Sequence, residues 1–200
     1  MIDEGVIKFN CDWTKTGPIQ FSDFKNLNSW RKKLFGLGLI GVYPDGIGFG
    51  NISVRERGKE FIISGTQTGG LLELKAEHYV RILDYSIQRN WIQCEGPLKA
   101  SSESLTHAMI YELNPAIHAT LHIHESRLWE ALKGKVPATD SKTPYGTSEM
   151  ALEVKKLYQN TDLQNQKILV MLGHEDGIIT FGKDLEEATN ILLSRLNKNN

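Results

Sequence analysis

The stretch 116–124, Ala-Ile-His-Ala-Thr-Leu-His-Ile-His, is typical of a β-strand and ends in a His-x-His pair. Successive side chains of a strand point to opposite faces, so His122 and His124 are expected on the same face. Two imidazoles on one face of a rigid strand provide half of a metal site. Elsewhere in the chain stand Glu103, in Ala-Ser-Ser-Glu-Ser, and His174, in Leu-Gly-His-Glu-Asp-Gly. Three histidines and one placed carboxylate favour a catalytic zinc site over a structural one.

Each of these residues also has a simpler interpretation. An isolated His-x-His pair is more often part of sheet packing than a ligand pair, and Glu103 alone could be an acid that stabilises the first turn of a helix. His118 has the same parity as the pair but lies about 13 Å away along a strand, so we expect it at the strand start. His78 and His107 are interpreted as structural, although His107 lies one helical turn from Glu103 and could orient its carboxylate.

The hydrophobic periodicity predicts an alternation of helices and strands. Helices are expected over 22–40, 101–113, 125–133, 147–158 and 184–196, and strands over 52–55, 61–64, 117–124, 167–172 and 177–181. Residues 79–87 favour a strand, with a helix left open, and 6–13 are consistent with an edge strand. The expected N-caps are Ser22, Ser101 or Ser102, and Thr147 or Ser148. This succession favours one layered α/β domain over residues 1–200, with 1–20 as an N-terminal extension, and leaves the strand order open.

The composition argues against several classes of function. A net charge of -1 gives no electrostatic basis for binding nucleic acid or a membrane surface, and Arg31-Lys32-Lys33 is interpreted as a solvated helix face. The N-terminus lacks the apolar run of a signal peptide, and no stretch approaches the roughly 20 apolar residues of a membrane helix. Cys11 and Cys94 have no CxxC spacing and indicate no disulfide framework, which favours a reducing, cytoplasmic compartment.

Two glycine-rich turns, 46–51 and 65–70, are candidate anion sites. Their backbone amides are free of side-chain crowding, and such nests suit phosphate. Ser101 and Ser102 add hydroxyl groups at a helix N-terminus, which also attracts anions. The alternative is that both glycine-rich stretches are simply loops.

Four segments resemble the class II aldolase/adducin family, the zinc-dependent sugar-phosphate aldolases and epimerases. They are Gly50-Asn51-Ile52-Ser53-Val54-Arg55, Ser101-Ser102-Glu103 with His107, His122-Ile123-His124, and the run from His174 to Gly182 followed by Leu185-Glu186-Glu187-Ala188. Each motif alone is weak, but four in the family's order are fairly specific. The resemblance implies a three-layer α/β/α sandwich with a central, largely antiparallel sheet. It also implies a homotetramer with active sites between neighbouring subunits.

The resemblance also implies roles for individual residues. His122, His124 and His174 would hold zinc, with manganese or cobalt as alternatives because imidazoles suit several divalent ions. The metal would act as a Lewis acid that stabilises an enediolate, and Glu103 would be the general base. The candidate phosphate contacts are Asn51, Thr66, Ser101 and Ser102.

The expected function is that of a metal-dependent lyase acting on a small hydroxy-carbonyl compound, expected to be phosphorylated. An epimerase or dehydratase on the same scaffold, or a non-catalytic adducin-like assembly protein, are the alternatives. The sequence departs from the family at Gly48-Phe49, where a small hydroxyl residue is usual, and at Glu175-Asp176, which could shift the third ligand or let Asp176 approach the metal. The family's proton-donating tyrosine after His-x-His is not found, because Tyr145 falls in Pro-Tyr-Gly-Thr, which aligns better elsewhere. The proton donor therefore stays open.

Overall fold

A computed structural model describes residues 5–199, so Asn200 and the first four residues of the expected N-terminal extension lie outside the described residues. The strands are β1 (Asn10–Lys15), β2 (Gly41–Val42), β3 (Gly48–Phe49), β4 (Asn51–Arg55), β5 (Phe61–Ser64), β6 (Tyr79–Ser86), β7 (Trp91–Gly96), β8 (Ala119–His124), β9 (Ile168–Val170) and β10 (Gly177–Gly182). The α-helices are α1 (Phe24–Gly36), α2 (Ser104–Leu113), α3 (Ser126–Leu132), α4 (Ser148–Asn160), α5 (Leu163–Gln166) and α6 (Leu185–Asn199), and a 3-10 turn spans Ala76–His78. None of the described helices is long and apolar enough to cross a membrane.

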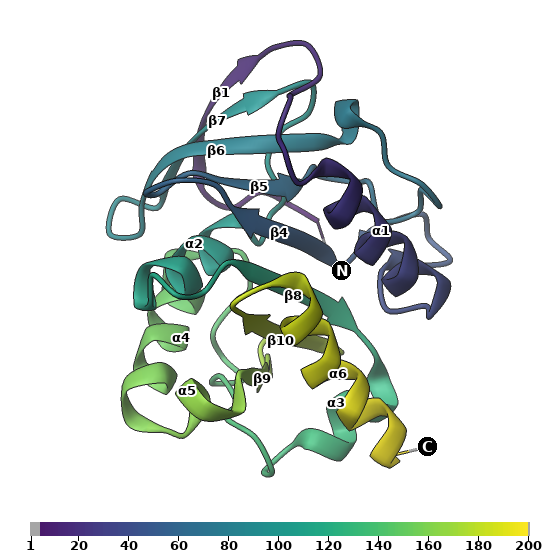
Figure 1. The fold of residues 1–200 in the computed structure, drawn as a ribbon. Coiled ribbons are helices and arrows are strands. Elements are labelled where there is room, and N and C mark those ends of the chain that lie inside the picture. Colours follow the sequence, from purple (N-terminus) through teal and green to yellow (C-terminus); the bar gives the residue numbers. More distant parts are fainter. Residues whose placement is uncertain (1–4, 200) are drawn as a thin grey trace.

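Eight strands form one central sheet in the order β1-β7-β6-β5-β4-β8-β10-β9, and β2 and β3 form a separate short hairpin. Neighbouring strands of the large sheet are antiparallel except β1 and β7, which run parallel. The expectation of a largely antiparallel central sheet is confirmed. The His-x-His strand, β8, lies between β4 and β10 and is hydrogen-bonded on both sides, which fixes its backbone (Figure 1).

Apolar side chains are buried on both faces of the sheet. Phe61 and Ile63 of β5 pack in one cluster, which includes residues of α2 and α4. Ile62, between them, packs in a second cluster, which includes residues of α1, α3 and α6. Because alternate residues of a strand face opposite ways, the two clusters lie on opposite faces of β5.

The edge strand β1 attaches the N-terminal segment to the rest of the fold. Asn10 donates its backbone N–H to the carbonyl oxygen of Asn90, and the indole of Trp13 donates to the carbonyl oxygen of Gly96. Cys11 and Cys94 are free thiols whose Sγ atoms lie 3.5 Å apart. The segment that leads into β1 is therefore held at its downstream end.

Some helix starts differ from the expectation. Asp23 rather than Ser22 stands at the N-cap of α1, and Glu103 rather than Ser101 or Ser102 stands at that of α2. The hydroxyl of Ser101 instead accepts from the Glu103 backbone N–H, just outside the helix. Thr147 caps α4 as expected, because its hydroxyl accepts from the backbone N–H of Met150.

The sequence interpretation also missed the strands β2, β3 and β7, the helix α5 and the 3-10 turn at Ala76–His78. Strand β7 follows a turn at Ile87–Asn90 that contains neither glycine nor proline. Asn90 adopts the positive φ, 47°, for which glycine is the usual residue in a turn. The four-residue α5 is too short for a periodic signal. The glycine-rich turn expected at 46–51 contains β3, which pairs with β2.

The interpretation of Arg31 as part of a solvated helix face is wrong. Arg31 is only 1% exposed, because it lies three and four residues from the buried Leu34 and Leu27 on the same face of α1. Its guanidinium donates to the carbonyl oxygens of Thr68, at 2.9 Å, and Gly69, at 2.7 Å. Burial lowers the pKa of Arg31 to about 10, so the side chain keeps its charge at neutral pH.

Candidate metal centre and active site

The structure brings His122, His124 and His174 together. Their ligand-capable atoms all lie within 4.8 Å of one another, and the three side chains are buried. His122 and His124 project from the central strand β8, whereas His174 comes from the turn between β9 and β10. No other described residue belongs to this group, so neither Glu103 nor Asp176 lies as close to all three imidazoles.

The protein environment keeps two of these imidazoles neutral. Burial, followed by repulsion from neighbouring imidazoles, holds the pKa of both His122 and His124 well below the ordinary value for histidine. A neutral imidazole has a lone pair on one ring nitrogen, and this lone pair is what a metal ion needs.

The free ring nitrogens fit a cation. Nε2 of His122 and Nε2 of His124 are buried and have no hydrogen-bond partner, which would be costly without a ligand. The other nitrogen of each ring has a partner: Nδ1 of His122 lies 3.3 Å from Asn51 Nδ2, and Nδ1 of His124 lies 2.6 Å from Tyr43 Oη. Such outer partners fix ring orientation in metal sites.

Glycine at position 177 leaves room beside the cluster. A Cβ atom added there would lie 3.3 Å from His122 Nε2 and 3.0 Å from the carbonyl oxygen of His174. The residues present therefore fit a divalent cation, because three buried imidazoles lie close together, two of them with an unpartnered Nε2, and position 177 adds no side chain that would crowd them.

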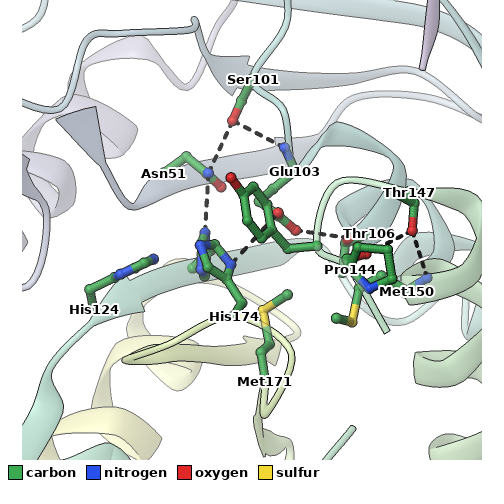
Figure 2. A network of polar contacts seen from close by, with 12 residues as sticks. Asn51, Ser101, Glu103, Thr106, His124, Pro144, Thr147, Met150, Met171 and His174 are labelled. Carbon is green, nitrogen blue, oxygen red and sulfur yellow. Dashed lines mark hydrogen bonds and ion pairs between the residues drawn. The ribbon is translucent and has the colours of Figure 1, made fainter. Parts of the chain in front are cut away.

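Glu103 lies beside this cluster and is 1% exposed. Its Oε2 accepts a hydrogen bond from Thr106 Oγ1 at 2.9 Å, and its Oε1 lies 3.8 Å from His174 Nδ1 (Figure 2). The side chain is thus held by the first turn of α2 and reaches the imidazole cluster. A buried carboxylate in this position can accept a proton from a group bound at the cluster.

Asn51 connects the imidazole cluster to the predicted phosphate contacts. Its Nδ2 donates to Ser101 Oγ at 3.0 Å (Figure 2). The same nitrogen lies 3.3 Å from His122 Nδ1. With Thr66 and Ser102, Asn51 and Ser101 line one small cavity. Gly48 and Gly50 of the first glycine-rich turn and Gly65 and Gly69 of the second also line it. The structure therefore places all four candidate phosphate contacts around one cavity.

That cavity is narrow. Its volume is about 20 Å³, which is room for roughly one water molecule. Gly5 from the N-terminal segment also lines it, and a Cβ added at Gly5 would lie 2.4 Å from Gln67 Nε2. The N-terminal segment therefore packs closely against the second glycine-rich turn.

The remaining histidines do not belong to the cluster, although His107 is near enough to His122 to contribute to the lowering of its pKa. His107 Nδ1 lies 2.7 Å from Ser53 Oγ, which agrees with a structural role, and Thr106 rather than His107 holds Glu103. Nδ1 of His78 accepts from the backbone N–H of Lys75. His118 is exposed and immediately precedes β8, as expected.

Two aromatic residues at the site have no clear signal in the sequence. Tyr43 stands in the β2–β3 hairpin and contacts His124. The ring of Tyr145, in the Pro-Tyr-Gly-Thr stretch before α4, stacks on His174 with centroids 4.0 Å apart and an interplanar angle of 17°. Both belong to loops, whose positions do not follow from periodicity.

Comparisons with known proteins agree on one family. Residues 45–194 match the sequence model of the Class II Aldolase and Adducin N-terminal domain. None of the curated proteins compared with the chain matches it at a significant level.

Solved structures show the same fold at low sequence identity. An L-fuculose-1-phosphate aldolase from Thermus thermophilus is 23% identical, with a TM-score of 0.62 over 88% of this chain and 89% of its own. A second L-fuculose 1-phosphate aldolase is 23% identical, with a TM-score of 0.67 over 90% of this chain and 84% of its own. YgbL from Klebsiella pneumoniae, whose description names three activities, aldolase, epimerase or decarboxylase, is 20% identical. Its TM-score is 0.62 over 85% of this chain and 83% of its own. The family match covers most of the chain and includes every residue of the imidazole cluster, so this protein belongs to the class II aldolase and adducin family.

Proposed function

We propose that the protein is a metal-dependent, aldolase-type lyase that acts on a small hydroxy-carbonyl compound. The observation that carries this proposal is the buried cluster of His122, His124 and His174 with Glu103 beside it. Two of these imidazoles, His122 and His124, have a buried Nε2 without a hydrogen-bond partner, and their closeness to His174 supports a shared ligand. The three histidines would hold zinc or another divalent ion, which would polarise the carbonyl oxygen of the substrate.

Glu103 is the proposed general base. Its buried carboxylate would take the proton from the substrate carbon next to the carbonyl group. The hydrogen bond from Thr106 Oγ1 fixes one carboxylate oxygen, which leaves the other directed toward the cluster (Figure 2). Removal of the carboxylate charge should therefore stop proton transfer without dismantling the metal site.

The substrate is proposed to carry a phosphate group. The cavity lined by Asn51, Thr66, Ser101 and Ser102 joins the imidazole cluster through the Asn51 side chain. Backbone amides of the glycine-rich turns and the hydroxyl groups before α2 suit an anion there. Because the cavity is small, the phosphate would enter only when the N-terminal segment moves away from Gln67.

We also propose that the protein works as a homo-oligomer, a tetramer by analogy with its family. Val42, Leu71 and Leu72 are exposed to 48%, 40% and 59%. A Cβ atom added at Gly70 would lie 3.2 Å from the Val42 side chain, so these apolar residues lie close together. Exposed apolar patches of this kind are typical of contacts between subunits.

The first test is metal content, measured on protein purified without added metal. We expect about one zinc ion per chain in the wild type, its loss in His122→Ala, and its retention in the matched control His118→Ala. The control changes an exposed histidine just before the same strand. If the wild type takes up no divalent ion even after zinc is added, the proposal is wrong and a non-catalytic assembly protein is favoured.

The second test follows proton transfer. Zinc-loaded protein is incubated in D₂O with dihydroxyacetone or dihydroxyacetone phosphate, and exchange of the carbon-bound hydrogens is followed by NMR. Glu103→Gln should keep the metal and lose exchange by a factor of about 10² or more, whereas Glu112→Gln, an exposed residue of the same helix, should behave as wild type. Full exchange in Glu103→Gln would remove Glu103 from the mechanism. Product analysis with aldol donors and acceptors then separates cleavage from epimerisation.

A further inference from the structure

His174 is held differently from the other two imidazoles. His122 and His124 belong to a strand that is hydrogen-bonded on both sides, and each ring has a polar partner at Nδ1. His174 lies in a turn, where its backbone N–H donates to the carbonyl oxygen of Met171, and its ring Nδ1 lies 3.8 Å from Glu103 Oε1. The sheet therefore does not fix the direction of this imidazole as it fixes the other two.

Tyr145 contacts the flat face of the His174 ring. The two rings are nearly parallel, and Tyr145 is 7% exposed. The backbone around Tyr145 is constrained, because a Cβ atom added at the next residue, Gly146, would lie 2.9 Å from the carbonyl oxygen of Ser102. Tyr145 is thus attached to the segment that begins α2, and its ring restricts how far the His174 ring can rotate.

Lys8 contacts the same tyrosine. Its Nζ lies 3.6 Å from the centroid of the Tyr145 ring and donates to the Tyr145 carbonyl oxygen at 3.3 Å. The His174 ring already occupies one face of Tyr145 at 4.0 Å, so the ammonium group must cover the other face. The backbone of Lys8 is anchored in turn, because its carbonyl oxygen accepts from Asn90 Nδ2 at 2.8 Å and the next residue, Phe9, is buried.

We propose that Lys8 is a positioning residue of the metal site, which acts through the ring of Tyr145 to hold His174 in the direction required for metal binding. The inference rests on the proposed metal site and goes beyond it, because Lys8 lies outside residues 45–194, the part that matches the family. A cation over the face of an aromatic ring is attracted by the ring quadrupole, most strongly where water is excluded. The N-terminal segment thereby becomes part of the metal site.

The test compares zinc affinities by competition with a chromophoric chelator. Lys8→Met should lower the affinity about fivefold, the factor that corresponds to a cation–π contact of about 1 kcal/mol. Loss of a positive charge near the site would by itself raise the affinity for a cation, so a weaker affinity reports lost positioning. Lys8→Arg should restore affinity to within about twofold, and Lys15→Met, which removes an exposed lysine of β1, should have no effect.

A double-mutant cycle shows whether Lys8 acts through Tyr145. Tyr145→Leu should weaken zinc binding about tenfold, Tyr145→Phe should keep the stacked ring and the affinity, and Lys8→Met should cost nothing further in the Tyr145→Leu background. The cobalt-loaded protein supplies a second readout, because a reoriented imidazole changes the visible absorption spectrum of the ion. Unchanged affinity in Lys8→Met, or additive losses in the double variant, would overturn the inference while leaving the metal site intact. A wild type that binds no metal would instead overturn the proposed function.

Discussion

The hydroxyl of Tyr43 lies 2.6 Å from Nδ1 of His124, which leaves Nε2, a buried atom without a hydrogen-bond partner, as the ring nitrogen available to a metal ion. A histidine that binds a metal through Nε2 carries its proton on Nδ1 and donates it to an outer partner. The Tyr43 oxygen can accept the hydrogen bond from that N–H. Tyr43 belongs to the β2–β3 hairpin and is 81 residues before His124 in the sequence, so the tertiary fold creates this contact.

Tyr43→Phe should therefore weaken metal binding without unfolding the protein. The ring would still pack beside Phe49, whose centroid is 4.6 Å away, but Nδ1 of His124 would lose its partner. We expect zinc affinity to fall by about tenfold, measured by chelator competition. Tyr158→Phe, which removes a hydroxyl bonded to Asn114, is the control and should keep wild-type affinity.

Asn51 should serve the same purpose for His122. In the structure its amide nitrogen faces both Ser101 Oγ and His122 Nδ1, while its Oδ1 is buried without a partner. If the amide turns by 180°, the oxygen can accept from both groups, which is the arrangement that a metal-bound His122 requires.

Two substitutions separate these roles of Asn51. Asn51→Leu should lower zinc affinity about tenfold because Nδ1 of His122 is left without an acceptor. Asn51→Asp, which offers only acceptors, should keep the affinity or raise it. Equal losses in both variants, determined with the same chelator, would show that the amide N–H rather than the oxygen is needed.

The small cavity beside Gly5 leads to a prediction about phosphate. Deletion of residues 2–7 keeps Lys8 and β1 but removes the glycine that packs against Gln67. The nest should then open, and inorganic phosphate should bind about tenfold more tightly in calorimetry than it does to the full chain. Adding Ser101→Ala to the shortened protein should reverse the gain. If phosphate binds equally with and without residues 2–7, the segment does not restrict the nest.

The sequence allowed the strand-borne half of the site to be predicted, and the loop-borne half only in part. His122 and His124 share a face because a strand has a period of two, which is a local property. That His174 and Glu103 lie near the His-x-His pair was predicted from the family resemblance, because residues far apart in the sequence come together only through the tertiary fold. Tyr43 and Tyr145 could not be predicted, because loop conformations carry no periodic signal. Arg31 was misinterpreted because its partners are backbone carbonyl groups of another loop, which no side-chain pattern reveals.

Arg31 leads to a prediction about stability. It donates to the carbonyl oxygens of Thr68, Gly69, Leu71 and Leu72, so its loss would leave the buried carbonyl groups of Thr68 and Gly69 unsatisfied. Arg31→Met should lower the free energy of unfolding by about 3 kcal/mol in urea denaturation. Lys32→Met is the matched control. The ion pair of Lys32 with Glu73 is more than half exposed on both sides, so its removal should change stability by less than about 0.5 kcal/mol.

His107 makes the stability of the metal-free protein depend on pH. Complete burial lowers its pKa to about 3, against about 6.5 in an unfolded chain. As the pH falls below about 6.5, the unfolded chain takes up a proton that the folded protein does not, and the folded state loses about 1.4 kcal/mol per pH unit from this group. His122 and His124 shift in the same direction, so their effects add to it.

His107→Asn isolates this contribution. Asparagine can still pair with Ser53 Oγ, as His107 Nδ1 does at 2.7 Å, but it does not titrate. The free energy of unfolding, measured with a chelator present at several values between pH 7 and pH 5, should fall less steeply in this variant, by about 1.4 kcal/mol per pH unit below pH 6. The control variant His118→Asn changes an exposed histidine, so its free energy of unfolding should depend on pH as steeply as that of the wild type. Equal slopes in wild type and His107→Asn would mean that His107 takes up its proton in the folded state, and the buried contact with Ser53 would then have to open in acid.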